Sequence, residues 1–200
     1  LAFLLQEHHL TRTKAIEIRA KQVAKNLGLM YLQADRPPGE AKGGTAIVIP
    51  LNMIEPKPKE TAEEAQRRVG ASLSTTPDGR MVSVTTLING SEITLTSIYA
   101  PVYPPDRAAF FTGIKSRLTK SHLIGMDANC VFNPAIDVSR PDGTTKPPDT
   151  AGTAELHSAL ADNDLTDIAR EALGDIPYHT HTKVLQGGVD TTQNHIDHIH

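Results

Sequence analysis

The stretch His122–Arg140 reads HLIGMDANCVFNPAIDVSR, and it joins an apolar run to a series of polar groups. The run stops at Asp127, Asn129 follows two residues later, and Asp137 stands ten residues after Asp127. Burying a carboxylate is costly unless a partner compensates its charge. A buried strand that ends on an acid therefore indicates a site at that strand end.

Composition limits the class of protein to which this strand belongs. The chain has 200 residues, of which 38% are hydrophobic and 22% charged, as expected for one soluble globular domain. A formal net charge of −3 argues against a protein held to nucleic acid by bulk positive charge, but leaves room for an enzyme that contacts phosphates locally. The opening LAFLL is too short for a signal peptide or a membrane span. Because the first residue is Leu1 rather than Met, we expect a fragment of a longer chain.

Cys130 is the single cysteine, which excludes an internal disulfide and suits a reducing compartment. Nothing beside it in the sequence would lower its pKa, so we interpret it as a small buried side chain rather than a nucleophile.

Hydrophobic spacing and turn residues divide the chain into alternating strands and helices. Asn89-Gly90 predicts a β-hairpin turn, and the polar segment 51–79 is interpreted as a surface insertion with a short helix. Strands interleaved with helices and a hairpin favour an α/β layered fold with mixed sheets. We expect strands at Leu1–Leu5, Leu29–Leu32, Thr45–Pro50, Met81–Leu87, Glu92–Ile98, His122–Met126, Thr180–Leu185 and His195–Ile199, and helices at Lys14–Leu27, Asp106–Leu118 and Ala151–Ala161.

Polar groups follow four of the expected strands, at Glu7, Tyr99, Asp127 with Asn129, and Asp197. Layered α/β proteins build sites at such strand ends. Three separated acids, Glu7, Asp127 and Asp197, would suit a Mg²⁺ site that assists phosphoester hydrolysis. If the extended backbone continues past Asp127, its side chain and that of Asn129 share one face.

Each of these signals also has a plain structural interpretation. Glu7 could belong to a solvated turn, and Asp127 and Asn129 to an Asx turn. Tyr99 could be a partly buried ring with its hydroxyl at the surface, and Asp197 an exposed edge-strand residue. Asp167 and Arg170 are interpreted as a structural hydrogen-bonded pair, and Asp137 as part of a loop.

In chain order, the motifs resemble the endonuclease/exonuclease/phosphatase superfamily, and within it the apurinic-type endonuclease domain of non-LTR (LINE-type) retrotransposons. The resemblance covers essentially the whole chain, and ELHSALADNDLTDIAR is similar to a helix and a Leu-x-Asp-x-x-Arg strand of that family. The matching motifs are Leu5-Gln6-Glu7, Gly43-Gly44-Thr45-Ala46-Ile47, Ser97 to Pro101, the helix DRAAFF, Asp127-Ala128-Asn129 with Asp137 to Arg140, YHTHT and HIDHI.

The resemblance implies a DNase I-like fold, a four-layer α/β sandwich with two mixed β-sheets packed face to face and helices outside. It implies a Mg²⁺-dependent endonuclease, with Mn²⁺ as a second usable ion, that nicks target DNA for target-primed reverse transcription. The implied partners are DNA, through its phosphate backbone, and a reverse transcriptase domain of the same polyprotein. No membrane partner is implied. The parent element would act in the nucleus, and this domain would be monomeric.

The resemblance also implies a role for each site residue. Glu7 would ligate the metal, Tyr99 would contact the scissile phosphate, and Asp127 would position or deprotonate the attacking water. Asn129 would hydrogen-bond the phosphate, Thr180 would support the site, and Asp197 would lie beside the metal or orient a general-base histidine. The chain 1–200 would be a single domain that lacks the family's first strand and its C-terminal Ser-Asp-His segment, and we expect its activity to be impaired.

Three alternatives stay open. Met126 and Ala128 stand where the family has Gly and an aromatic residue, which would suit a catalytically dead retroelement remnant. A phosphatase of the same fold could act on a phosphoester other than DNA. In a different class, the histidine-rich tail could form a zinc-binding module from His179, His181, His198 and His200.

Overall fold

A computed structural model describes residues 2–8, 14–34, 44–139, 149–174, 176, 181–184, 191–194 and 197–199. The chain divides into two compact units. The first comprises Leu1–Tyr99 and Ser121–Gly125, and the second Ala100–Lys120 and Met126–His200. No helix within the described ranges is long and apolar enough to cross a membrane.

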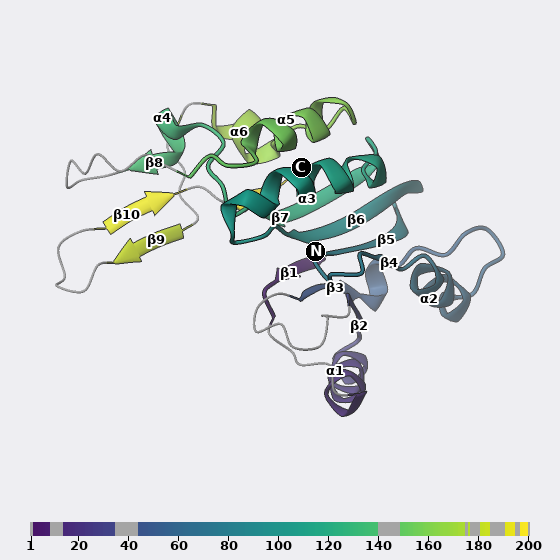
Figure 1. Cartoon of the computed structure of the whole chain (residues 1–200). Helices are drawn as coiled ribbons and strands as arrows, with labels where there is room; N and C mark the ends of the chain where they lie inside the picture. The colour runs from purple at the N-terminus through teal and green to yellow at the C-terminus, as the bar shows by residue number, and fades with distance from the viewer. Residues whose placement is uncertain are drawn as a thin grey trace. The chain divides into compact units, whose positions relative to one another are not determined.

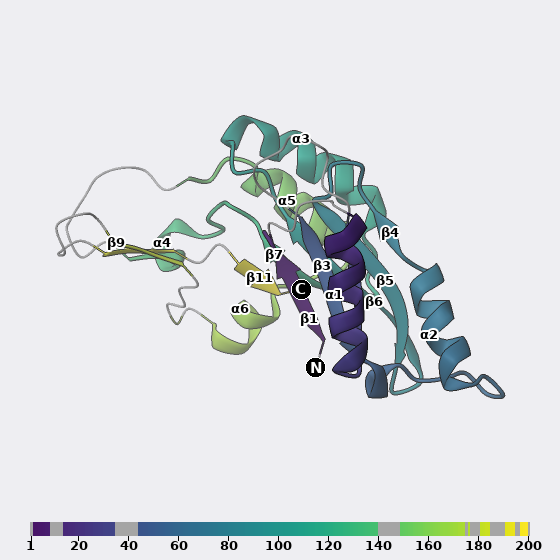
Figure 2. The same cartoon turned by 90° about the horizontal axis from the view of Figure 1, so that it is seen from below.

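The first sheet of the first unit has the strand order β1-β3-β2, with β1 at Phe3–Gln6, β3 at Thr45–Pro50 and β2 at Leu29–Gln33. Both strand pairs are antiparallel. The central strand β3 has the sequence TAIVIP, and its first five residues are buried, as a continuous apolar run predicts. Helix α1 (Lys14–Asn26), drawn in dark purple in Figure 2, lies beside β2. It ends before Gly28, whose φ of 70° suits glycine.

The second sheet has the order β11-β7-β6-β5-β4 and is built around a long hairpin (Figure 1). β5 (Met81–Ile88) and β6 (Ser91–Tyr99) pair in antiparallel register through Asn89 and Gly90, whose φ values are 51° and 74°. Positive φ at both central residues defines the hairpin turn that the sequence predicts. The short β4 (Ser74–Thr75) pairs with β5.

The strand that carries Asp127 is β7 (His122–Asp127), which passes from the first unit into the second after Gly125. The Thr94 amide donates to the Ser121 carbonyl, and the Ala100 amide donates to the Asp127 carbonyl. Residue numbers thus increase in the same direction on both strands, from Thr94 to Ala100 and from Ser121 to Asp127. The strands β6 and β7 are therefore parallel, and the sheet is mixed. Helix α3 (Pro104–Ile114) lies in the crossover that a parallel pair requires.

The core of the first unit lies between its two sheets. Apolar side chains of β2 and β3 meet those of β5 and β6, and Ala65 and Val69 from α2 (Ala62–Ala71) join them. Thr61 and Glu64 form a capping box that begins α2. The core residues of the strands are Leu32, Ile47, Ile49, Val82, Val84 and Leu95.

The second unit continues from α3 into a short 3₁₀ turn, Lys115–Arg117. Helix α5 (Thr153–Ala161) lies beside α3 (Figure 1). Two short helices follow, α4 (Pro134–Asp137) and α6 (Ile168–Leu173). A separate sheet has the order β8-β10-β9, with β8 at Val138–Ser139, β10 at Thr191–Asn194 and β9 at His181–Val184. Strand β11 (Asp197–Ile199) belongs to the second sheet described above.

Three sequence-based assignments in the second unit are wrong. The expected strand around Leu165–Arg170 gives way to helix α6, because the Asp167 side chain caps it and Ala, Arg, Glu and Leu favour a helix. The segment expected to join the last two strands contains β10, which pairs with β9. Helix α5 begins at Thr153 rather than at the expected Ala151, since Gly152 occupies the N-cap and the Thr153 hydroxyl donates to the Val131 carbonyl.

Candidate active site

The end of β7 is an Asx turn rather than a continued strand. The backbone amide of Asn129 donates to Oδ1 of Asp127 over 3.0 Å, and Asn129 has a φ of 50°. Asparagine tolerates this left-handed conformation better than most residues. The two side chains therefore do not share a face by strand alternation, and they are brought together by a turn that the carboxylate itself closes.

The Asp127–Asn129 turn is fixed to the segment that follows Tyr99. The Ala100 amide donates to the Asp127 carbonyl over 2.8 Å, and the Asn129 side-chain amide donates to the Ala100 carbonyl over 3.0 Å. Ala100, which follows Tyr99 in the Tyr-Ala-Pro motif, thus joins the Asp-x-Asn motif within the second unit. The hydrogen bonds hold the half-buried Asp127 carboxylate and the Asn129 amide in one place.

Met126 and Ala128 flank Asp127, and both are buried, at 2% and 0% exposed. Neighbouring residues of a strand point to opposite faces, so Met126 points away from the side of Asp127. The two departures from the family pattern thus lie in the packed interior, and their direct effect is on packing rather than on the polar groups at the strand end.

In the first unit, Gln6 of the Leu-Gln-Glu motif joins the two sheets. Its side-chain amide donates to the Ser97 hydroxyl over 2.9 Å and to the Gly125 carbonyl over 3.1 Å, and the Ser97 hydroxyl donates to the Leu5 carbonyl. Glu7 follows directly, is half-buried, and has a φ of 52°. The role of Gln6 was not predicted, although a polar side chain at the end of the apolar strand β1 was a signal for it.

Tyr99 is 1% exposed, so its hydroxyl does not lie at an open surface. Its backbone amide donates to the Arg80 carbonyl over 2.8 Å, and the Arg80 guanidinium carbon lies 5.4 Å from the centre of its ring. The phosphate contact expected of Tyr99 stays a prediction.

The C-terminal site residues are described only in part. Asp197 begins β11, its side chain lies outside the described part, and Thr180 lies outside the described residues. His181 and His198 lie on strands, again without described side chains, while His179 and His200 lie outside the described part.

The oxygen donors of Glu7, Asp127 and Asp197 match what Mg²⁺ prefers in proteins. Within the described residues, no group of three or more His, Cys, Asp or Glu side chains forms a metal cluster. The expected ligand set includes Asp197, whose side chain lies outside that part. The donor chemistry therefore fits a hard divalent cation.

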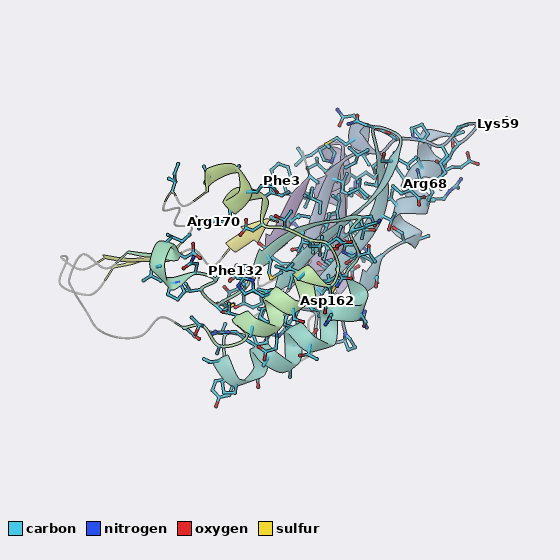
Figure 3. The ribbon with its side chains drawn as sticks, turned by 90° about the horizontal axis from the view of Figure 1, so that it is seen from above. Phe3, Lys59, Arg68, Phe132, Asp162 and Arg170 are labelled. Carbon is cyan, nitrogen blue, oxygen red and sulfur yellow. The ribbon has the colours of Figure 1, made fainter. Side chains whose placement is uncertain are left out.

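A cavity of about 520 Å³ lies in the second unit, and an ion pair between Arg170 and the buried Asp137 lines it. Arg170 donates to the Asp137 carboxylate, which is 1% exposed and also accepts from the Asn133 amide over 2.7 Å. Arg170 and Phe132, both labelled in Figure 3, border this cavity. The Arg170 backbone amide also donates to Oδ1 of Asp167 over 3.1 Å, so the expected hydrogen bond between Asp167 and Arg170 is present and forms the N-cap of α6.

Cys130 is 1% exposed, and burial raises the pKa of its thiol. This environment suits the small buried side chain that the sequence analysis assigned.

Comparisons with known proteins bear on the fold. No family model matches the chain, and no curated protein matches its sequence. Among solved structures, the endonuclease domain of TRAS1, a telomere-specific non-LTR retrotransposon, is similar with a TM-score of 0.55 and 16% identity over 98% of this chain and 84% of that chain. The Leishmania major AP endonuclease LMAP is similar with a TM-score of 0.67 and 13% identity over 99% of this chain and 68% of that chain.

The catalytic domain of Xenopus laevis APE2 is also similar, with a TM-score of 0.59 and 17% identity over 99% of this chain and 72% of that chain. At these identities the likeness concerns the fold. The predicted α/β architecture of two sheets with helices is confirmed, and the chain has the DNase I-like fold.

Proposed function

We propose that this chain is a divalent-metal-dependent DNA endonuclease that hydrolyses one phosphodiester bond and nicks target DNA for retrotransposon integration. The observation that carries the proposal is the Asp127–Asn129 turn at the end of β7, closed by the carboxylate and fixed to Ala100. The DNase I-like fold, shared with a retrotransposon endonuclease domain, supports the same class of reaction.

Asp127 is the group we assign to the attacking water. Its carboxylate already accepts from the Asn129 backbone amide, which fixes the orientation of the side chain. A positioned carboxylate can hold a water in line with the phosphorus atom and take its proton as the bond forms.

Asn129 is assigned to the scissile phosphate. An asparagine amide has two N–H donors, and one of them bonds the Ala100 carbonyl. The second N–H can donate to a phosphoryl oxygen, on which negative charge increases in the transition state.

Glu7 and Asp197 are assigned to the metal, and Tyr99 and Thr180 to supporting contacts with the phosphate and the site. When bound there, Mg²⁺ or Mn²⁺ supplies Lewis-acid stabilisation of the phosphoryl oxygens. We further propose DNA and a reverse transcriptase domain of the same polyprotein as partners, and the nucleus as the place of action.

Conversion of supercoiled plasmid to the open circle tests this proposal. We expect nicking with Mg²⁺ or Mn²⁺ and none with EDTA. If the chain does not nick and instead releases phosphate from an inositol phosphate, the fold serves the phosphatase alternative. No hydrolysis of either substrate would favour the catalytically dead remnant.

A further inference from the structure

Arg107 is a buried cation at the beginning of α3 and is only 2% exposed. Its guanidinium turns back to the loop before the helix, with Nε donating to the Pro101 carbonyl over 2.9 Å and Nη2 to the Val102 carbonyl over 2.8 Å. A cation near a helix N-terminus is unfavourable for the helix dipole. Helix stability therefore does not explain why an arginine stands here.

The same guanidinium forms a two-pronged contact with Asp149. Nη1 lies 2.8 Å from Oδ1, and Nη2 donates to Oδ2 over 2.8 Å. Such a paired geometry fixes direction as well as distance, and a lysine cannot reproduce it. Gly152 packs against Arg107 so closely that a Cβ there would lie 2.7 Å from the Arg107 Cβ.

Asp149 connects this contact to the candidate site. Its carbonyl accepts from the Val131 amide over 2.9 Å, and Val131 stands two residues after Asn129. The Asn129 side chain bonds the Ala100 carbonyl, and Ala100 precedes Pro101, which Arg107 holds. The interactions therefore close a ring through Arg107, Asp149, Val131, Asn129 and the segment Ala100–Val102.

We propose that Arg107 is a positioning residue, which holds the Ala100–Val102 segment and the Asp127–Val131 segment at a fixed separation. In this role it keeps the Asn129 amide aligned without touching the substrate. Small displacements of groups that contact the reacting atoms cost large factors in rate, so such alignment matters for catalysis. The catalytic consequence rests on the proposed function, whereas the positioning itself does not.

Hydrogen exchange tests the positioning independently of activity. In Arg107→Lys the charge remains and the paired contact is lost, so we expect the Ala100 and Val131 amides to exchange about 10-fold faster or more. The Thr94 amide, in the first unit, should keep its rate. Arg117→Lys makes the same change at an exposed arginine and should leave all three amides unaltered.

Asp149→Asn provides a second variant at a residue whose side chain is 45% exposed, which keeps folding secure if Arg107→Lys does not fold. It should also increase the hydrogen-exchange rates of the Ala100 and Val131 amides. If Ala100 and Val131 exchange at wild-type rates in a folded Arg107→Lys or Asp149→Asn variant, the inference is overturned.

Plasmid nicking then separates the inference from the proposed function. We expect Arg107→Lys to lower kcat about 10-fold or more with little change in KM, and to add nothing in an Asn129→Ala background, because both changes act on one alignment. Wild-type protein that does not nick would refute the proposed function, while the exchange rates would still decide the positioning. Independent, multiplying losses in the double variant would refute the link to Asn129.

Discussion

A carboxylate at the end of β7 is stabilised by the chain that follows it. Asp127 accepts the Asn129 backbone amide, and Asn129 adopts a left-handed φ of 50° that its side chain type tolerates. The same asparagine reaches the Ala100 carbonyl with its side chain. A single turn thus offsets part of the free-energy cost of burying the Asp127 carboxylate, and it fixes the positions of the Asp127 and Asn129 side chains.

Cys130 should be unreactive in the folded protein, because it is 1% exposed and burial raises the pKa of its thiol above the ordinary value. We expect labelling with a disulfide reagent at pH 8 to be about 100-fold slower than in urea. As the chain has one cysteine, the absorbance change reports this thiol alone. Equal rates in the two states would contradict the buried placement.

Removal of the Asp137 carboxylate should destabilise the second unit. Asp137 is 1% exposed, and Asp137→Ala removes the buried carboxylate that accepts from both the Arg170 guanidinium and the Asn133 amide. We expect a loss of about 3 kcal/mol in the free energy of unfolding, measured with urea. The control Asp106→Asn, at an exposed position in the first turn of α3, should cost less than about 1 kcal/mol. Equal losses would contradict the pair.

Side-chain contacts between residues far apart in the sequence could not be predicted from the sequence. Asp127, Asn129 and the buried character of Cys130 are local signals, and they could be identified from the strand that precedes them. The partners of Gln6, Arg107 and Asp137 lie more than 30 residues away, at Ser97, Asp149 and Arg170. No periodicity or spacing encodes such pairs.

Among the elements, the β5–β6 hairpin depends on its turn. Gly90 has a φ of 74°, and its amide and that of Asn89 both donate to the Glu55 carboxylate, over 2.9 Å and 2.6 Å. A side chain at positive φ is strained, so Gly90→Ala should cost about 1 kcal/mol or more in the free energy of unfolding. Urea unfolding measures this loss.

Gly113 provides the matched control for Gly90. It lies within α3, and a Cβ there would meet no atom within 4 Å. Gly113→Ala should therefore stabilise the protein by up to about 1 kcal/mol, because alanine favours a helix. If Gly90→Ala lowers the free energy of unfolding no more than Gly113→Ala does, the dependence of the hairpin on its turn is contradicted.

His122 at the beginning of β7 should make stability depend on pH. Burial lowers the pKa of its imidazole, and Nδ1 lies 3.1 Å from the Thr96 hydroxyl oxygen. The unfolded chain therefore binds the proton more readily than the folded one, so stability falls as the pH drops below about 6.5. In His122→Gln, the loss between pH 7.5 and 5.5 should be smaller than in wild type. An identical loss would contradict a half-buried, neutral imidazole at His122.

Sequence patterns predicted elements well where one pattern dominates. The apolar run of β3 and the Asn-Gly turn between β5 and β6 each predict a single structure. Helix α6 and strand β10 were missed because both are short, and their boundaries depend on local caps and strand partners rather than on periodicity. Asp167 could have revealed α6, since it is a favourable N-cap before a run of helix formers.

At the scale of the whole molecule, the fold could be predicted further than the site. The order of the motifs along the chain was enough to predict the architecture. The likeness to the TRAS1, LMAP and APE2 structures confirms the DNase I-like fold. The site depends on individual side chains from segments far apart in sequence. Its assignment as a single domain with a DNA-nicking centre stays a prediction.

The initial rate of plasmid nicking by Asp127→Asn, measured against wild type in Mg²⁺, tests the central claim most directly. The asparagine oxygen can still accept the Asn129 amide, so the turn survives while the negative charge is removed. We predict a fall of about 100-fold or more, with Asp106→Asn within about twofold of wild type. Nicking by Asp127→Asn at the wild-type rate would contradict the assignment of Asp127 to the attacking water.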